Sequence, residues 1–267
     1  MTGAAMDWLG LNGKVAVITG GGGGIGRACV QSFLDAGCAV VSLDLGAASV
    51  TALRDSFVGD SFHAIDCDVT SADSLAAAAE TVAERFGGAD ILINNAGILR
   101  PGPLADLPLA DWRKMLAVNL DGVLMATQIF ARQMAPRGGG ALVHVASISA
   151  SNPQPFSGAY SAGKAAVAML SRQIAFEMAP QGIRSNVVSP GLVLTPLSAA
   201  FYQDPEVRLA RERHVPLGRI GDPQDMADVA LYLASPRAGY VTGQEIIVDG
   251  GLSQTLMANV PRPGYAS

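Results

Sequence analysis

The sequence predicts an α/β fold: one doubly wound, seven-stranded parallel sheet with helices on both faces. Two observations predict it. The chain is 49% hydrophobic and only 15% charged, as expected when strands are buried on both faces. Short runs rich in Val and Ile also alternate with longer stretches of helical periodicity. Because no linker or charge block interrupts this alternation, we expect a single domain over residues 1–267.

Short apolar runs mark the expected strands, at residues 15–19, 39–44, 62–66, 91–94, 141–146, 184–189 and 245–248. The expected helices between them include residues 24–36, 71–86, 111–135, 157–179 and 222–234. Residues 192–221 interrupt the alternation with prolines and two short helical patches. They form either a lid on the substrate side or an ordered surface excursion. The tail at 252–267 covers the pocket, reaches a neighbouring subunit or frays.

Charge and cysteine content exclude several classes of partner. A net charge of -5 disfavours binding to nucleic acid or anionic lipid, which requires clustered Lys and Arg. Cys29, Cys38 and Cys67 leave an odd thiol without metal-ligand spacing, so we expect small buried thiols, a reducing compartment and no metal site. No stretch reaches membrane-spanning length without polar interruption, and residues 1–14 do not resemble a signal peptide. We therefore expect a cytoplasmic protein without a membrane partner.

A glycine-rich turn follows the first expected strand and opens the first expected helix. Residues 19–26 read TGGGGGIG and contain the pattern GxGxxG. Glycine lets the backbone turn tightly and approach a diphosphate, whose charge is stabilised by free amides at the helix N-terminus. A Walker-type loop is excluded because Arg27 and Ala28 stand where Lys and Ser or Thr would follow. We expect a Rossmann fold whose turn binds a dinucleotide through Gly20, Gly22, Gly24, Ile25 and Gly26.

Asp44 indicates which dinucleotide is bound. It ends the second expected strand, 18 residues after Gly26, where a carboxylate can accept hydrogen bonds from both adenosine ribose hydroxyls. The 2'-phosphate of NADP would meet a like charge there, and neither the glycine turn nor Leu45-Gly46 offers a basic residue to offset it. The sequence therefore favours NAD. The other interpretation is that Asp44 only caps the following turn.

Tyr160, Lys164 and Ser147 are the candidate catalytic residues. Tyr160 and Lys164 are four residues apart on an expected helix, so both side chains leave the same face. Ser147 follows the fifth expected strand at the carboxyl edge of the sheet, where ligands bind in such folds. Alcohol oxidation removes the hydroxyl proton as hydride leaves carbon, and a tyrosine with a pKa of roughly 10 needs a nearby cation to act as the base. We expect Lys164, helped by the positive nicotinamide ring of NAD+, to lower the pKa of Tyr160, and Ser147 to hold the substrate oxygen.

These motifs occur together in an order and spacing typical of one enzyme family: Thr19-Gly20-(x)3-Gly24-Ile25-Gly26, Asn94-Asn95-Ala96-Gly97, Asn119, Ser147, Tyr160-x-x-x-Lys164 and Pro190-Gly191. Over roughly residues 11–251 the chain resembles the short-chain dehydrogenase/reductase family. The resemblance implies an NAD-dependent oxidoreductase and a homotetramer, in which the long helices after the fourth and fifth strands pair across a dyad. It also implies that Lys164 holds the nicotinamide ribose. By the same resemblance, Asn119 interrupts the hydrogen bonding of its helix and positions a water for proton relay to Lys164. The further expected cofactor contacts are Leu45, Asp68, Val69, Asn95, Ala96, Gly97, Pro190, Gly191, Val193 and Thr195.

The substrate is harder to predict. The expected substrate contacts are Ser147, Ser149, Gln154, Tyr160 and Leu192, with Asn152, Phe201 and Tyr202 nearby. Asn152 and Gln154 could bind a hydroxyl or a second carbonyl, whereas the apolar remainder of the expected pocket at residues 149–156 and 191–194 favours an uncharged, hydrophobic or cyclic secondary alcohol or ketone. One alternative is a ketoreductase of the 3-oxoacyl-[acyl-carrier-protein] type, although such enzymes commonly use NADPH, which Asp44 disfavours. An alternative of another class is a non-catalytic regulator that senses NAD, although such a protein would be expected to lack Tyr160, Lys164 or Ser147.

Overall fold

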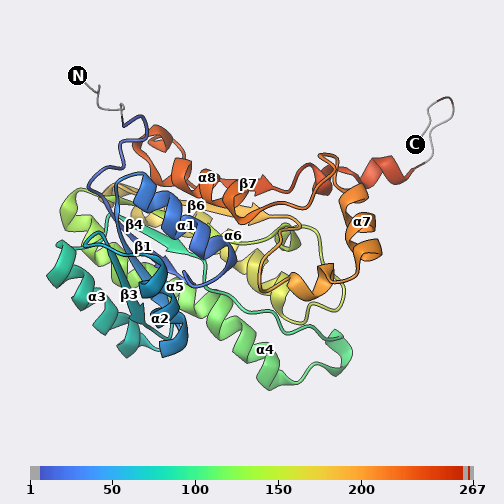
Figure 1. Ribbon diagram of the computed structural model, residues 1–267, viewed down its shortest axis with the longest axis horizontal. Coiled ribbons are helices and arrows are strands. Elements are labelled where there is room, and N and C mark those ends of the chain that lie inside the picture. Colours follow the sequence, from blue (N-terminus) through green and yellow to red (C-terminus); the bar gives the residue numbers. More distant parts are fainter. Residues whose placement is uncertain (1–6, 261–263, 265–267) are drawn as a thin grey trace.

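The computed structural model describes residues 7–260 and 264. Within this part, seven parallel strands form one sheet in the order β3-β2-β1-β4-β5-β6-β7 (Figure 1). The strands are β1 (Val15–Thr19), β2 (Ala39–Asp44), β3 (Phe62–Asp66), β4 (Ile91–Asn94), β5 (Gly140–Val145), β6 (Ile183–Pro190) and β7 (Glu245–Val248). The predicted doubly wound sheet is confirmed. Its strand order changes direction between β1 and β4, which leaves a crevice for a ligand above the carboxyl ends of these strands.

Helices cover both faces of the sheet (Figure 1). They are α1 (Gly24–Asp35), α2 (Ala47–Ser56), α3 (Ala72–Phe86), α4 (Leu109–Leu116), α5 (Gly122–Met134), α6 (Tyr160–Met178), α7 (Pro205–His214) and α8 (Pro223–Ala234). On one face α1 packs against α8, and on the other α3 packs against α5. The sequence did not single out α2, because only Val50 and Leu53 of this helix are buried.

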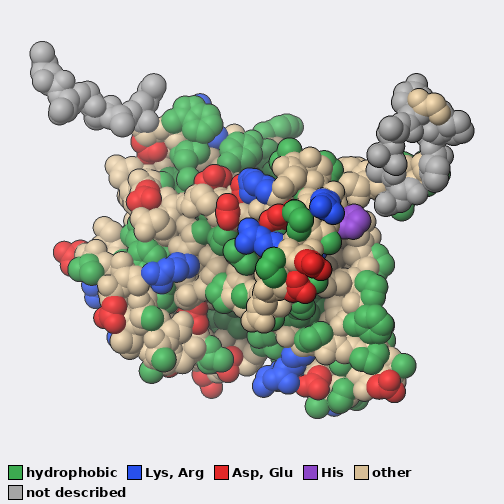
Figure 2. All heavy atoms as spheres, turned by 45° about the vertical axis from the view of Figure 1, so that its right-hand side comes forward, with side chains coloured by type: hydrophobic (Ala, Val, Ile, Leu, Met, Phe, Trp, Pro, Cys, Tyr) green, Lys and Arg blue, Asp and Glu red, His purple; other side chains and the backbone are tan. Residues whose placement is uncertain are grey.

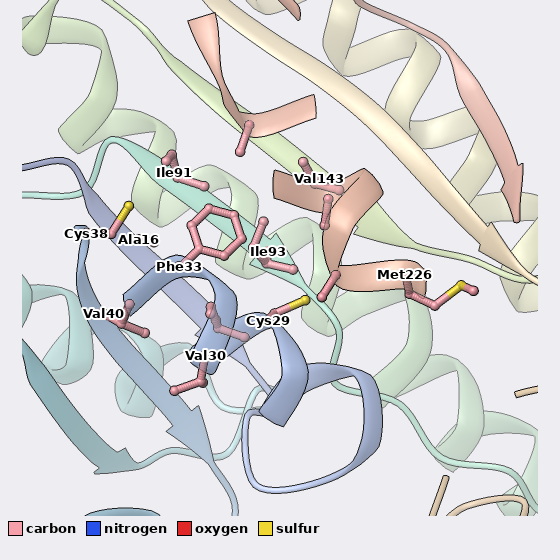
Figure 3. Close-up of a cluster of buried hydrophobic side chains, with 14 of the residues drawn as sticks. Ala16, Cys29, Val30, Phe33, Cys38, Val40, Ile91, Ile93, Val143 and Met226 are labelled. Carbon is pink, nitrogen blue, oxygen red and sulfur yellow. The ribbon is translucent and has the colours of Figure 1, made fainter. Parts of the chain in front are cut away.

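The strands alternate apolar side chains between the two faces, as a sheet buried on both sides requires. Ala16 and Ile18 of β1 belong to the cluster under α1 and α8. Val15 and Val17 belong to the opposite cluster, under α3 and α5. Figure 3 shows the Phe33 ring of α1 lying among Ile91, Ile93 and other side chains of the first cluster. This packing holds α1 against the sheet on the face that it shares with α8.

The helix predicted over residues 111–135 is not continuous. The structure divides it into α4 and α5 with a π-helical turn at Ala117–Asp121 between them. A π turn inserts an extra residue and breaks the regular i to i-4 hydrogen-bond pattern, often at a functional site. Asn119 lies in this turn and is buried. The interruption of helix hydrogen bonding that the family resemblance implies at Asn119 is therefore confirmed, and it divides the predicted helix in two.

Residues 192–221 form an excursion from the βα alternation that contains α7. Its two ends are joined by hydrogen bonds from Leu194 N to Gly221 O at 3.0 Å and from Gly221 N to Leu192 O at 2.8 Å. Phe201 and Tyr202, within it, line the cavity described below. The described part of the tail forms short 3-10 turns at Leu252–Gln254 and Leu256–Asn259 and does not line that cavity. The remaining tail residues, 261–263 and 265–267, lie outside the described residues, as do residues 1–6.

The surface contains both signs of charge. Figure 2 shows acidic and basic side chains interspersed over one face, where the described residues form no continuous basic patch. Across residues 7–260 and 264, no helix is long and apolar enough to cross a membrane. The three cysteines are buried and free, as the sequence predicts.

Candidate active site

The carboxyl ends of β1, β4, β5 and β6 surround a cavity of about 410 Å³. Small-molecule and cofactor sites generally enclose roughly 300–1,000 Å³. Gly20 follows β1, Asn95 follows β4, Ser147 follows β5 and Gly191 follows β6, and all four line the cavity. The cavity therefore lies at the edge of the sheet where the strand order predicts a ligand.

The glycine turn is held by close backbone packing. Gly20 has a φ of +67°, and a Cβ added there would lie 2.8 Å from the Cα of Ala96. A Cβ on Gly26 would collide with the carbonyl oxygen of Gly20. The Asn95 amide donates from Nδ2 to the carbonyl oxygens of Thr19 at 3.1 Å and Gly20 at 2.8 Å, which fixes the turn against β4. Glycine is thus required here for chain packing as well as for ligand approach.

The start of α1 fits a diphosphate. Gly23, its N-cap residue, makes no side-chain capping bond, and the first turn of α1 contains no acidic residue. A Cβ on Gly23 would find only Pro196 nearby, at 3.8 Å. Backbone N–H groups at a helix N-terminus bind anions through their unpaired donors and the helix dipole. The residues of this turn therefore suit the dinucleotide that the sequence predicts.

Asp44 lies beside the glycine turn and lines the cavity. Its Oδ2 accepts a hydrogen bond from the backbone N–H of Gly22 at 2.6 Å. Among the described residues no hydrogen bond reaches its Oδ1. The alternative interpretation was that Asp44 caps the turn that follows it. Its side chain instead accepts a hydrogen bond from the glycine turn, which precedes it in the chain. One carboxylate oxygen orients Asp44, and the other is left to face a ligand.

Tyr160, Ser147 and Lys164 converge at the cavity wall. The Ser147 side chain is hydrogen-bonded to Tyr160. The Lys164 ammonium lies 5.6 Å from the centre of the Tyr160 ring and donates from Nζ to the carbonyl oxygen of Val145 at 2.7 Å. The N-cap of α6 immediately before Tyr160 places Tyr160 and Lys164 on successive turns, so the spacing of four residues brings them to one face. Ser147 reaches the same wall of the cavity from just beyond the end of β5.

Burial controls the protonation of this group. It raises the pKa of Tyr160 above its ordinary 10.0, and the hydrogen bond with Ser147 offsets this only in part. It lowers the pKa of Lys164 from 10.5 to about 8. Both shifts have the same cause, because removing water disfavours the charged form of either side chain. In the protein alone, desolvation of the phenol is therefore the larger effect. The lowered pKa that is expected for Tyr160 beside a bound nicotinamide ring stays a prediction.

Asn119 supports the site from behind the cavity wall. Its Oδ1 accepts from the backbone N–H of Ile98 at 2.8 Å, and its Nδ2 donates to the Ile98 carbonyl at 2.9 Å. A Cβ added to Gly97 would lie 3.3 Å from the Asn119 Oδ1 and 3.7 Å from the Lys164 Nζ. The amide of Asn119 and the ammonium of Lys164 therefore face the same point, and Gly97 leaves it free of a side chain.

Most of the sequence-predicted site residues line the cavity: Gly20, Gly24, Ile25, Asp44, Asn95, Ala96, Gly97, Ser147, Gln154, Tyr160, Lys164, Pro190, Gly191, Leu192, Val193 and Thr195. Others lie outside its lining: Gly22, Gly26, Leu45, Asp68, Val69, Asn119 and Ser149. Leu45 is exposed, and Val69 packs against Gly122. Ser149 donates from Oγ to the Gln154 Oε1 at 3.3 Å, so it contacts a lining residue. The roles of this second group stay predictions.

Sequence reasoning missed several lining residues: Gly23, Leu99, Val145, Ala146, Pro196, Leu197, Ser198 and Arg211. Pro196 to Ser198 lie next to the predicted Thr195, and proximity was the available signal for them. Ser198 holds this segment by donating from Oγ to the Val193 carbonyl at 2.6 Å. No feature of the sequence pointed to Arg211, because it lies on a helix with several other charged residues. Only the packing of α7 over the cavity distinguishes it from them.

The chain is similar to several known proteins. A family model described as "Enoyl-(Acyl carrier protein) reductase" matches residues 20–253. The chain is 37% identical to the 7alpha-hydroxysteroid dehydrogenase of Escherichia coli K12 over 252 residues, which are 94% of this chain and 98% of that protein. It is 41% identical to the cis-4-hydroxycyclohexanecarboxylate dehydrogenase of Sinomonas cyclohexanicum over 242 residues, 89% of this chain and 96% of that protein. A solved gluconate 5-dehydrogenase from Burkholderia cenocepacia J2315, in complex with NADP and tartrate, is similar with a TM-score of 0.87 and 34% identity, and covers 94% of this chain and 99% of its own.

Proposed function

The chain belongs to the short-chain dehydrogenase/reductase family, and from this premise we propose that it moves a hydride between NAD and a secondary alcohol or ketone. The relatives are by name dehydrogenases of cyclic or polyhydroxy alcohols. The observation that carries the proposal is the convergence of Tyr160, Ser147 and Lys164 in a cavity that also contains the glycine turn. A regulator that only senses the dinucleotide would not need these three groups in contact.

The side chains divide the proton chemistry between them. Ser147 holds the substrate oxygen through a neutral hydrogen bond, and Tyr160 takes the hydroxyl proton in oxidation or returns it in reduction. NAD, when bound, supplies the carbon that accepts hydride and a positive charge that favours the phenolate. Lys164 adds its own positive charge beside the phenol ring. The proton can then pass through Lys164 to a water molecule, which Asn119 is proposed to position because its amide faces the same point as the Lys164 ammonium.

We propose NAD as the cofactor rather than NADP. Asp44 presents a carboxylate at the cavity, and the residues after it, Leu45 and Gly46, carry no charge that could pair with a 2'-phosphate. The gluconate 5-dehydrogenase neighbour was solved with NADP. The choice therefore rests on Asp44 of this chain, and the variant that tests it is treated in the Discussion.

A substrate panel tests the proposed reaction. The purified protein, given NAD and then NADP, is offered hydroxysteroids, polyols, cyclohexanols including 4-hydroxycyclohexanecarboxylate, and an acetoacetyl thioester with the reduced cofactors. We expect NAD to be reduced with a cyclic or polyhydroxy secondary alcohol, seen as NADH absorbance. Turnover restricted to the thioester with NADPH would support the ketoreductase alternative. No turnover with any member would contradict the proposed function.

The long helices after β4 and β5 also support the proposal of a homotetramer. Leu124 of α5 and Met169 of α6 are exposed apolar side chains, and Phe176 of α6 is 85% exposed. Apolar patches of this kind mark interfaces, and most soluble oligomers close by symmetry. We propose that these helices pair across a dyad, that the whole chain acts as one catalytic domain, and that the protein works in a reducing compartment such as the cytoplasm.

Replacing Phe176 by Asp tests the pairing. We expect the mass measured by light scattering to fall from that of a tetramer to that of a dimer or monomer, because a carboxylate cannot be buried in an apolar interface without a partner. Val58→Asp is the matched control, since Val58 is also highly exposed but lies between α2 and β3. A wild-type protein that is monomeric, or a Phe176→Asp variant of unchanged mass, would contradict the proposed interface.

A further inference from the structure

Arg211 has a polar atom without a partner inside the candidate site. It lies on α7 and lines the cavity together with Phe201 and Tyr202. Its guanidinium carbon lies 5.3 Å from the centre of the Phe201 ring and 5.1 Å from that of Tyr202. These cation–π contacts fix the direction of the side chain. Its Nη1 is nonetheless buried and has no hydrogen-bond partner among the described residues.

Each of the other two charged side chains that line the cavity makes a hydrogen bond to the backbone. Asp44 accepts from Gly22 N at 2.6 Å, and Lys164 donates to the Val145 carbonyl at 2.7 Å. Arg211 is the remaining charged residue among those that line the described cavity. A buried charged donor without an acceptor is unfavourable, and native proteins rarely retain one without a reason. Nothing in the proton chemistry assigned to Tyr160, Ser147 and Lys164 uses it.

We propose that Arg211 binds a carboxylate on the substrate, so that the enzyme acts on a hydroxy acid or its keto acid. The inference rests on the proposed function, because it places the anion on the same molecule that Tyr160 and Ser147 bind. A planar guanidinium forms paired hydrogen bonds with a carboxylate, and such charge-assisted bonds are stronger than neutral ones. This cation favours a charged substrate over the uncharged one that the sequence alone favours.

The cofactor diphosphate is the competing source of negative charge. The glycine turn and the uncapped N-terminus of α1 already offer it free backbone donors. Arg211 comes from α7, in the excursion at 192–221, and lies against the Phe201 and Tyr202 rings, which line the cavity with it. We therefore assign Arg211 to the substrate, and the experiment measures cofactor affinity separately.

The test compares two substrates that differ in charge alone, 4-hydroxycyclohexanecarboxylate and 4-hydroxycyclohexanecarboxamide. For each protein the measured quantity is the ratio of kcat/KM for the acid to kcat/KM for the amide. We expect Arg211→Gln to lower this ratio by about 10-fold to 100-fold, the usual effect of losing a hydrogen bond to a charged group. Arg213→Gln is the control, because it removes the same charge from an exposed position of α7. It should leave the ratio at the wild-type value.

A second measurement keeps the proposal testable if the cyclohexane ring is a poor substrate. Cyclohexanecarboxylate and cyclohexanecarboxamide are then compared as competitive inhibitors of the best alcohol in the panel, with the same variants and the same expected ratio. An unchanged ratio in Arg211→Gln would overturn the carboxylate site but not the proposed reaction, which the turnover of the panel alcohol supports. A loss of NAD affinity in Arg211→Gln, measured by fluorescence titration, with an unchanged ratio would assign Arg211 to the diphosphate instead.

Discussion

Tyr160→Phe should lower kcat by about 10²-fold to 10⁴-fold, the usual contribution of a positioned acid or base, while the Kd for NAD changes by less than about twofold. The substitution removes one oxygen atom and keeps the ring, so the packing of the buried aromatic side chain against Lys164 is retained. The proton of the substrate hydroxyl then has no acceptor at the position that Tyr160 occupies. Because the lost interaction acts only during proton transfer, the loss appears in kcat more than in cofactor binding.

Single-turnover absorbance at 340 nm and fluorescence titration of NAD measure the two quantities. Tyr240→Phe is the matched control, because the Tyr240 side chain is fully exposed and lies outside the cavity lining. We expect it to behave as wild type. Turnover of Tyr160→Phe within about fivefold of wild type would show that another group moves the proton, which would contradict the assignment of general acid/base catalysis to Tyr160.

Asp44→Ala should lower the preference for NAD over NADP, expressed as the ratio of the two kcat/KM values, by about 100-fold or more. The carboxylate is expected to accept two ribose hydrogen bonds, and the loss of both is about 3 kcal/mol if each contributes at the lower end for a charged acceptor. Removing the negative charge also relieves its repulsion of the 2'-phosphate. The first effect lowers kcat/KM with NAD, and the second raises kcat/KM with NADP. The ratio of the two values therefore changes more than either value alone.

The variant also loses the hydrogen bond that Asp44 accepts from Gly22 N, which can loosen the glycine turn. Such loosening affects both cofactors, so it leaves their ratio almost unchanged. Asp44→Asn retains an acceptor for Gly22 and should shift the ratio in the same direction. Asp35→Ala removes an equal charge from the exposed end of α1 and should not shift it. An unchanged ratio in both Asp44 variants would place cofactor selection at other residues.

Local patterns were sufficient to predict much of the fold. Short continuous apolar runs predicted the strands, because each strand of this sheet is covered on both sides and can be recognised without contact information. The helix α2 escaped prediction for the converse reason. It is covered on a narrow strip at Val50 and Leu53, so its periodicity is weak.

The meeting of the catalytic side chains could also be predicted from local sequence. Tyr160 and Lys164 meet because residues four apart share a helix face, and the helix itself follows from sequence periodicity. Asp44 was predicted beside the cofactor because the end of β2 lies next to the end of β1 in this strand order. Local sequence could not predict that the Asp44 carboxylate accepts a hydrogen bond from the Gly22 N–H, because this contact depends on how the glycine turn folds back.

The sequence by itself determined the sheet, the glycine turn and the identity of the three converging side chains, because these depend on periods of two and 3.6 residues and on backbone freedom. The tertiary structure alone decided the raised pKa of Tyr160 and the unpaired Arg211 in the cavity. Each of these depends on which groups exclude water from a side chain, and that is set by neighbours far away along the chain.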